Sequence, residues 1–240
     1  KILTTHGKEM RTFNDFDLSS FSPKEGVVML CYPSNPTGYC PEISEIEDFV
    51  IKCGERGITI ILDLPYYYLF NDAESISCLF RDNVIIVSSF SKSIGLSGYR
   101  IGYVSTKNNV LYQAMRIRSL YKYNSISTIP QRIICGLLKQ QTAIEEYKEK
   151  TAENIKNNIM VLEMNDLLMD YPSTPKGPFA VVKMSYDELL DAGISSVPLS
   201  KFTLNKKLSD DNLSRISVAV DCKLFWEYFE KVVAKQNEVV

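Results

Sequence analysis

Three continuous apolar runs, each of strand length, place the strongest constraint on how this chain folds. They span residues 26–32, 58–63 and 83–88. An unbroken apolar run of this length indicates a strand covered on both faces, as in a parallel sheet. Between the first two runs, residues 41–53 open with proline and acidic residues and continue with apolar residues at helical spacing, which predicts a crossover helix. Strand, helix and strand predict a right-handed parallel unit, which binds ligands at the carboxyl ends of its strands.

Polar side chains follow the first two runs at that end. Asn35 lies in the turn-forming cluster Pro-Ser-Asn-Pro-Thr-Gly after the first run, and Asp63 ends the second. An asparagine in this position is well placed to donate a hydrogen bond to a ligand oxygen. The alternatives are a plain turn at Asn35 and a helix-capping or turn carboxylate at Asp63.

The third run leads into a polar loop that holds a lysine, and an apolar run at residues 101–104 follows as another strand. From Ser89 to Gly102 the loop reads Ser-x-Ser-Lys-x-x-Gly-Leu-x-Gly-x-Arg-x-Gly. A lysine that is partly desolvated can lose its proton and attack an aldehyde to form a Schiff base, so Lys92 is a candidate nucleophile. The Ser89 hydroxyl and the Arg100 guanidinium are spaced to hold one phosphate beside it. Together they predict a pyridoxal phosphate pocket; the alternative is a surface lysine in a serine- and glycine-containing loop.

The full spacing of this loop resembles the lysine signature of class I/II aminotransferases, which are pyridoxal-phosphate-dependent enzymes of fold type I. Five further motifs resemble those of the same family. They are Asn-Pro-Thr-Gly at 35–38, Asp-x-x-Tyr at 63–66, Gly-Pro-Phe-Ala at 177–180, Val-Pro-Leu-Ser-Lys-Phe at 197–202 and Arg-x-Ser-x-Ala at 215–219. Because the motifs run from residue 33 to residue 219, nearly the whole chain resembles the carboxyl-terminal part of this family.

The resemblance implies catalytic and substrate-binding roles for three residues. Lys92 would hold the cofactor as a Schiff base and then act as the general base at the substrate α-carbon. Asp63 would face the pyridine nitrogen and keep it protonated, so that the ring accepts electrons. Arg215 would clamp the substrate α-carboxylate with two parallel hydrogen bonds.

The resemblance also implies contacts to the rest of the cofactor. Asn35 and Tyr66 would bind the phenolic oxygen, and the Asn35–Pro36 peptide bond is expected to be cis. Ser89 and Arg100 would bind the phosphate, with Ser91 assisting. The alternative for Tyr66 is an aromatic side chain that only packs.

The predicted fold is α/β, with a mainly parallel sheet and crossover helices, as in the large domain of pyridoxal-phosphate-dependent transferases, and a smaller α+β domain after it. Apolar spacing predicts helices over residues 108–120 and 224–233, and one long helix over residues 131–168. We expect the second domain to begin within the long helix. Residues 1–140 would then belong to the cofactor-binding domain and residues 141–240 to the small domain.

These observations predict an aminotransferase that moves the amino group of an α-amino acid to a 2-oxo acid. Two alternatives stay open. Lys92, Asp63 and Arg215 fix the cofactor and the carboxylate but not the bond that breaks, so the same pocket also suits a β-lyase, a synthase or a decarboxylase. The third possibility is not enzymatic: an aminotransferase-like sensing domain of a transcription regulator.

Composition excludes several other classes. The 27 basic and 29 acidic residues are interspersed and leave a formal net charge of −2, so nucleic acid and membrane surfaces are not expected partners. No apolar run approaches the roughly 18 residues needed to span a bilayer, which leads us to expect a cytoplasmic protein. Six cysteines without a Cys-x-x-Cys pair and the single histidine, His6, predict reduced thiols and no zinc site.

The first residues, 1–5, enter in mid-pattern without an initiator methionine, and we expect the chain to be part of a longer one. The resemblance implies that a phosphate-binding loop precedes residue 1 in the family, and that the whole protein is a homodimer acting on amino acids and 2-oxo acids.

Overall fold

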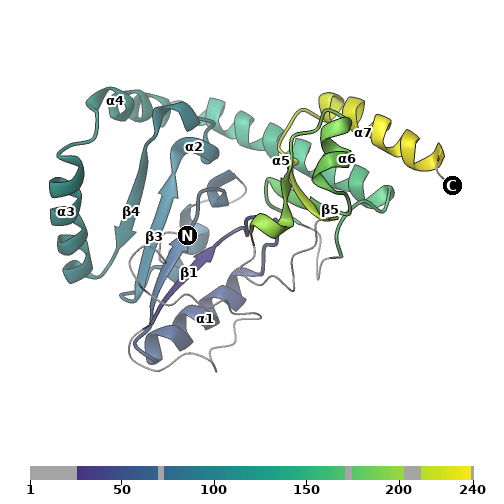
Figure 1. The fold of residues 1–240 in the computed structure, drawn as a ribbon. Helices are drawn as coiled ribbons and strands as arrows, with labels where there is room; N and C mark the ends of the chain where they lie inside the picture. Colours follow the sequence, from purple (N-terminus) through teal and green to yellow (C-terminus); the bar gives the residue numbers. More distant parts are fainter. Residues whose placement is uncertain (1–25, 70–72, 171–174, 203–211, 239–240) are drawn as a thin grey trace.

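The structure is a computed structural model that describes residues 26–69, 73–170, 175–202 and 212–238. Its strands form a four-stranded sheet and a three-stranded sheet. Figure 1 shows the long helix α5 (Gln141–Met164) running from the helices beside the larger sheet to those around the smaller one. His6 and residues 1–5 lie outside the described residues.

The larger sheet is mainly parallel, as predicted. In sheet order its strands are β1 (Val27–Cys31), β2 (Thr59–Asp63), β3 (Val84–Ser89) and β4 (Gly102–Thr106). The first three run parallel to one another, whereas β4 runs antiparallel to β3. Cys31 lies opposite Asp63, and Asp63 lies opposite Val87. The carboxyl ends of β1, β2 and β3 therefore meet at one edge of the sheet.

Helix α1 (Ile43–Glu55) is the predicted crossover between β1 and β2. The Glu42 and Glu45 side chains form a capping box at its start, which satisfies N–H groups that have no partner within the helix. Its apolar face packs into one core with the sheet strands. That core includes Ile46, Phe49, Val50, Cys53, Ile60, Leu62 and Val84. Helix η3 (Ala73–Leu79) contacts α1.

The loop that joins β3 to β4 carries Lys92. It contains one short helix, α2 (Phe90–Ser93), and one 3₁₀ turn, η4 (Ser97–Tyr99). Lys92 lies in α2, three residues past the end of β3. The 3₁₀ turn η2 (Tyr67–Leu69), which follows β2, contacts α2. The segments after β2 and after β3 are therefore neighbours.

The prediction of one helix over residues 131–168 is wrong. Three helices follow β4: α3 (Asn109–Tyr123), α4 (Thr128–Leu137) and α5. The N–H groups of Lys139 and Gln140 donate to carbonyl groups three residues earlier, so α4 ends in a tightened turn. Gly136 lies in this last turn, where glycine weakens a helix.

The smaller sheet has the order β5-β7-β6, and all its pairings are antiparallel. Its elements are β5 (Phe179–Val182), α6 (Tyr186–Asp191), β6 (Val197–Pro198), η5 (Leu199–Lys201), β7 (Ser214–Ser217) and α7 (Cys222–Glu238). A second apolar core joins this sheet to α5 and α7. It includes Ile159, Leu162, Leu189, Ile216 and Phe229. The α+β architecture expected after the parallel sheet is confirmed.

All six cysteines lie in the described part of the chain, and all are free thiols, as the sequence predicts. Cys53 is buried and Cys135 is exposed. Among the described helices, none combines the length and the apolar character that crossing a membrane requires.

Candidate active site

The parallel strands bring four predicted site residues to one edge of the larger sheet. Asn35 follows β1, Asp63 ends β2, Tyr66 comes three residues later, and Lys92 follows β3. The parallel pairing puts these strand ends side by side. Ligands bind at such an edge in open α/β sheets. The cis peptide bond expected at Asn35 is misplaced by three residues, because the described part of the chain has its cis bond at Tyr32–Pro33.

Arg215 reaches this edge from the smaller sheet. It lies in β7, opposite both Val181 of β5 and Val197 of β6. Its Nη1 donates a hydrogen bond to Oδ1 of Asn35 at 3.1 Å. The Asn35 side chain also lies close enough to the Tyr66 hydroxyl to lower its pKa. The predicted carboxylate clamp and the two predicted ligands of the phenolic oxygen therefore form one connected cluster.

Two phenylalanines hold the Arg215 guanidinium. Its central carbon lies 4.3 Å from the ring centroid of Phe179 and 5.1 Å from that of Phe202. Such contacts combine packing with attraction between a cation and an aromatic face. The Tyr66 ring meets Phe179 edge to face, with centroids 5.3 Å apart. We did not predict these roles: the motifs contain both phenylalanines, but a phenylalanine beside a strand usually only packs.

One polar atom of this cluster is left over. Arg215 Nε is buried and has no hydrogen-bond partner among the described residues. A buried donor without a partner costs free energy, and a second guanidinium nitrogen beside it is used by Asn35.

Burial controls the electrostatics of Tyr66 and Arg215. It raises the pKa of Tyr66 to about 12, although Arg215 and the Asn35 side chain oppose this rise. Tyr66 is therefore a neutral phenol at physiological pH and can donate a hydrogen bond. Burial also lowers the pKa of Arg215, while Tyr66 raises it. Arginine stays protonated in proteins, so the cluster carries one positive charge.

Asp63 is a partly buried carboxylate. Burial raises its pKa above the ordinary value. Its strand neighbour Cys31 has its pKa raised to about 12, mainly by burial and further by Asp63, so that thiol is neutral. A carboxylate that has lost its water is stabilised by a nearby cation. The site thus fits a ligand with a protonated ring nitrogen next to Asp63.

The lysine turn is fixed by serine side chains. The Ser89 hydroxyl accepts a hydrogen bond from the Ser91 N–H at 3.2 Å, which caps α2. The Ser93 hydroxyl donates to the Ser89 carbonyl at 3.1 Å. Lys92 itself is exposed. Its backbone is therefore held in place while its amine stays accessible to a ligand.

Arg100 does not join Ser89 in a shared hydrogen bond in the structure. Its guanidinium is exposed and donates to the Ser97 carbonyl in its own turn at 3.1 Å. Its backbone is left-handed, with φ of 53°, a conformation that few residues other than glycine adopt. Because Gly102 lies opposite Ser89 in the sheet, Arg100 returns to the same edge. No hydrogen bond among the described residues joins the two side chains.

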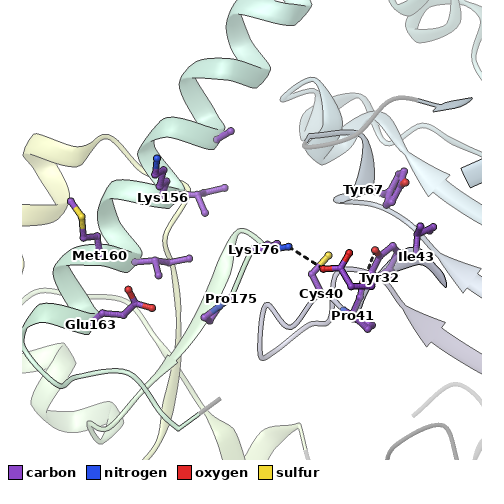
Figure 2. Close-up of a pocket in the computed structure, with 14 residues that line it drawn as sticks. Tyr32, Cys40, Pro41, Ile43, Tyr67, Lys156, Met160, Glu163, Pro175 and Lys176 are labelled. Carbon is purple, nitrogen blue, oxygen red and sulfur yellow. Dashed lines mark hydrogen bonds and ion pairs between the residues drawn. The ribbon is translucent and has the colours of Figure 1, made fainter. Parts of the chain in front are cut away.

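A cavity of about 640 Å³ lies elsewhere, between the start of α1 and the middle of α5. Figure 2 shows Lys156, Met160 and Glu163 of α5 on one side of it, and Tyr32 and Cys40 on the other. None of the eight predicted site residues lines it. The cavity is therefore separate from the cluster at the sheet edge.

Comparisons with known proteins find relatives of the whole described fold. Residues 12–223 match the family model described as aminotransferase class I and II. Histidinol-phosphate aminotransferase 2 of Haemophilus influenzae is 30% identical over 206 residues, which are 80% of this chain and 53% of that protein. The protein of the same name from Oceanobacillus iheyensis is 30% identical over 142 residues, which are 58% of this chain and 38% of that protein. The chain spans about half the length of these curated relatives, or less.

Among solved structures, an aromatic aminotransferase from Pyrococcus horikoshii is similar in fold. The TM-score is 0.73 at 21% sequence identity, and the match covers 92% of this chain and 63% of that one. At this identity the likeness establishes the fold. It shows that the two sheets and their helices are arranged as in part of a known fold.

Proposed function

Because this chain belongs to the class I and II aminotransferase family, we propose that it transfers the amino group of an α-amino acid to a 2-oxo acid, with pyridoxal 5′-phosphate as cofactor. One observation carries the proposal: Arg215 hydrogen bonds Asn35 at the edge where Lys92 and Asp63 also lie. A carboxylate-binding group, an amine nucleophile and a partly buried carboxylate would thus be combined in one site. This is the set of groups that transamination needs.

The residues present fit this cofactor. Asp63 would pair with the protonated pyridine nitrogen, which compensates the burial of its charge. Asn35 and Tyr66 would bind the phenolic oxygen, since each offers a hydrogen-bond donor. When bound, the cofactor supplies an electron sink for the charge that develops at the substrate α-carbon.

Three polar residues around the lysine turn would hold the phosphate. Ser89 and Ser91 carry hydroxyl groups at the start of α2, where the Ser91 N–H donates to the Ser89 hydroxyl. Arg100 would turn from the Ser97 carbonyl to the anion, because a charge-assisted hydrogen bond is stronger than one to a neutral carbonyl.

Lys92 would hold the cofactor through its Nζ and would also serve as the general base. As a free amine, this nitrogen would take the proton from the substrate α-carbon. The exposed position of Lys92 just after β3 supports both roles, because the amine must reach the cofactor and the substrate.

Arg215 orients the amino acid. A planar guanidinium meets a carboxylate with two parallel hydrogen bonds, and the Arg215 guanidinium reaches the site edge, where its Nη1 donates to Asn35 Oδ1. The contacts with Phe179 and Phe202 fix the plane of the guanidinium. The α-carbon of a bound amino acid would thereby be kept at one distance from the groups beside Asn35.

The proposal extends to the organisation of the protein. We assign residues 1–140 to the cofactor-binding domain and 141–240 to the small domain, supported by the two separate apolar cores. We also propose a homodimer, since α3 has no residue buried by the described part of the chain. A cytoplasmic location is supported by the free thiols, because disulfides are rare in that compartment.

An assay of amino-group transfer tests the function. The chain is incubated with pyridoxal 5′-phosphate, 2-oxoglutarate and a panel of L-amino acids, and the products are separated. We expect glutamate to form together with the 2-oxo acid of the donor. Release of ammonia or of carbon dioxide without glutamate would instead indicate a lyase or a decarboxylase. The relatives that match this chain are named as aminotransferases, which favours the first outcome.

A further inference from the structure

Backbone segments that flank the two sheets contact each other next to the Arg215 cluster. The N–H groups of Lys176 and Gly177 both donate to the carbonyl oxygen of Gly38, each at 3.1 Å. Gly38 belongs to the loop after β1, and Gly177 lies just before β5. We call this pair of backbone bonds the glycine contact.

Gly38 has no room for a side chain, and Gly177 has little. Gly38 has a φ of +70°, and a Cβ added to it would come within 2.1 Å of the Phe179 carbonyl oxygen. Real Cβ atoms essentially never lie closer than 3.0 Å to other atoms. A Cβ added to Gly177 would lie 3.1 Å from Gly38 Cα and 3.2 Å from Pro33 Cβ, so a methyl group fits there only if its neighbours move by a few tenths of an ångström. The close approach of the two segments therefore requires glycine at position 38 and is strained by a side chain at position 177.

The glycine contact is tied to the site by short, stiff connections. Gly38 lies three residues after Asn35, which accepts the hydrogen bond of Arg215. Gly177 lies two residues before Phe179, whose ring lies under the Arg215 guanidinium. β5 is in turn paired with β7, with Val181 opposite Arg215. A shift at the glycine contact is thus passed to Arg215 from both sides.

We propose that the glycine contact sets the separation between Arg215 and Asn35, and that Gly38 and Gly177 are positioning residues for the end of the site that binds the substrate carboxylate. The carboxylate-binding role of that end rests on the proposed function, whereas the geometry of the glycine contact does not depend on it. The neighbouring ion pair adds little: Lys176 Nζ lies 3.6 Å from Glu42 Oε1, and both side chains are largely exposed. Exposed ion pairs of this kind contribute little free energy.

The test follows the Nε–H signal of Arg215 by nuclear magnetic resonance in the ¹⁵N-labelled chain. The signal is assigned by its loss in Arg215→Lys. In the wild type we expect it to be shifted by the neighbouring phenylalanine rings and to exchange slowly with water, because Nε is buried. In Gly177→Ala we expect the signal to move toward those of exposed arginines and to exchange at least about tenfold faster, as in a locally opened structure. Gly136→Ala is the matched control, because a Cβ there meets nothing within 4 Å.

Two further measurements make the result decisive. Far-ultraviolet circular dichroism and the yield of reduced pyridoxal adduct on Lys92 should be the same in Gly177→Ala as in the wild type, which shows that the fold and the opposite end of the site persist. Gly38→Ala, with its stronger clash, should move the Arg215 signal further than Gly177→Ala does. For an amino acid substrate, we expect KM to rise about tenfold in Gly177→Ala with a much smaller change in kcat.

The proposal is overturned if both glycine variants keep the wild-type Arg215 signal, or if Gly136→Ala moves it as much as they do. A moved signal with an unchanged KM would also overturn it, because the contact would then not position the substrate. If the wild type transfers no amino group but the signal responds as expected, the proposed function fails while the link between the glycine contact and Arg215 is supported.

Discussion

Arg215 and Asn35 lie 180 residues apart in the sequence, yet a hydrogen bond of 3.1 Å joins Nη1 of the first to Oδ1 of the second. The bond connects the smaller sheet to the loop after β1 of the larger sheet. One residue is expected to bind the substrate and the other the cofactor. The site is therefore assembled across the two sheets, and each of its two ends can be tested separately.

Replacing Arg215 tests the carboxylate end. Arg215→Lys keeps the charge but removes the planar pair of donors. We expect kcat/KM for an amino acid to fall about 100-fold, or ~2.7 kcal/mol, with no loss of the pyridoxal adduct on Lys92. Arg56→Lys, at an exposed position at the end of α1, is the matched control and should leave kcat/KM unchanged. A fall of equal size in both variants would contradict the assignment.

Replacing Tyr66 tests the end that binds the phenolic oxygen. Tyr66→Phe removes one hydroxyl and keeps the ring that packs on Phe179. We expect a loss of about tenfold in kcat/KM, the size of one hydrogen bond. Since the pKa of Tyr66 is raised to about 12, its titration lies above the working range. The pH profile of kcat in Tyr66→Phe should therefore keep the wild-type shape between about pH 6 and pH 9. Loss of the fall in kcat at the basic end of the profile in this variant would contradict the prediction.

Asp63 should make the stability of the cofactor-free chain depend on pH. Burial raises its pKa above the ordinary value of 3.8, so the folded state binds the proton more tightly than the unfolded state does. Below pH 3.8 the free-energy cost of burying the ionised Asp63 carboxylate is absent, and this cost develops as the pH rises through the folded-state pKa. The side chain of Asp63→Asn cannot ionise, so the free energy of unfolding of this variant should increase relative to that of the wild type as the pH rises.

Urea unfolding at several pH values, without cofactor, measures this difference. Asp82→Asn, at an exposed position, provides the control and should follow the wild type at every pH. Adding pyridoxal 5′-phosphate should reverse the order at neutral pH, because the wild type then gains a cation beside its carboxylate. Parallel curves for Asp63→Asn and the wild type, with and without cofactor, would show that Asp63 has no such role.

The two apolar cores predict two separable units. Phe229→Ala leaves a cavity in the second core and should destabilise that unit by about 3–5 kcal/mol. Leu62→Ala should destabilise the first core by about 2–5 kcal/mol. Unfolding in urea is measured for each core by hydrogen exchange of peptides from that core. If the units fold separately, each variant lowers the urea midpoint of a different transition. A single transition shifted equally by both variants would contradict the division into domains.

Much of the larger sheet could be predicted from the sequence, because its strands are unbroken apolar runs that only a doubly covered strand explains. The residues after those runs were placed at one edge for the same reason. The break between α4 and α5 was missed, since apolar spacing continues across residues 138–140 and only the tightened hydrogen bonds of Lys139 and Gln140 show the end. A pattern of apolar residues indicates the period of a helix more clearly than it indicates where the helix ends.

The parts of the site that depend on tertiary contacts could not be predicted from residue patterns. Arg215 was selected through a motif, but nothing local indicates that its guanidinium lies over Phe179 and Phe202. The contact between Gly38 and Gly177 joins segments that are far apart in the sequence. Each glycine alone reads as an ordinary turn residue. Arg100 was expected beside Ser89, whereas its side chain bonds within its own turn.

The central claim is that Lys92 carries the cofactor. The measurement is a visible absorption spectrum of the purified chain with pyridoxal 5′-phosphate, followed by borohydride reduction and peptide mapping, with Lys92→Ala and an exposed-lysine variant, Lys107→Ala, in parallel. We predict a yellow protein whose reduced adduct lies on Lys92, is absent from Lys92→Ala and persists in Lys107→Ala. An adduct spread over several surface lysines, with equal yield in Lys92→Ala, would contradict the account.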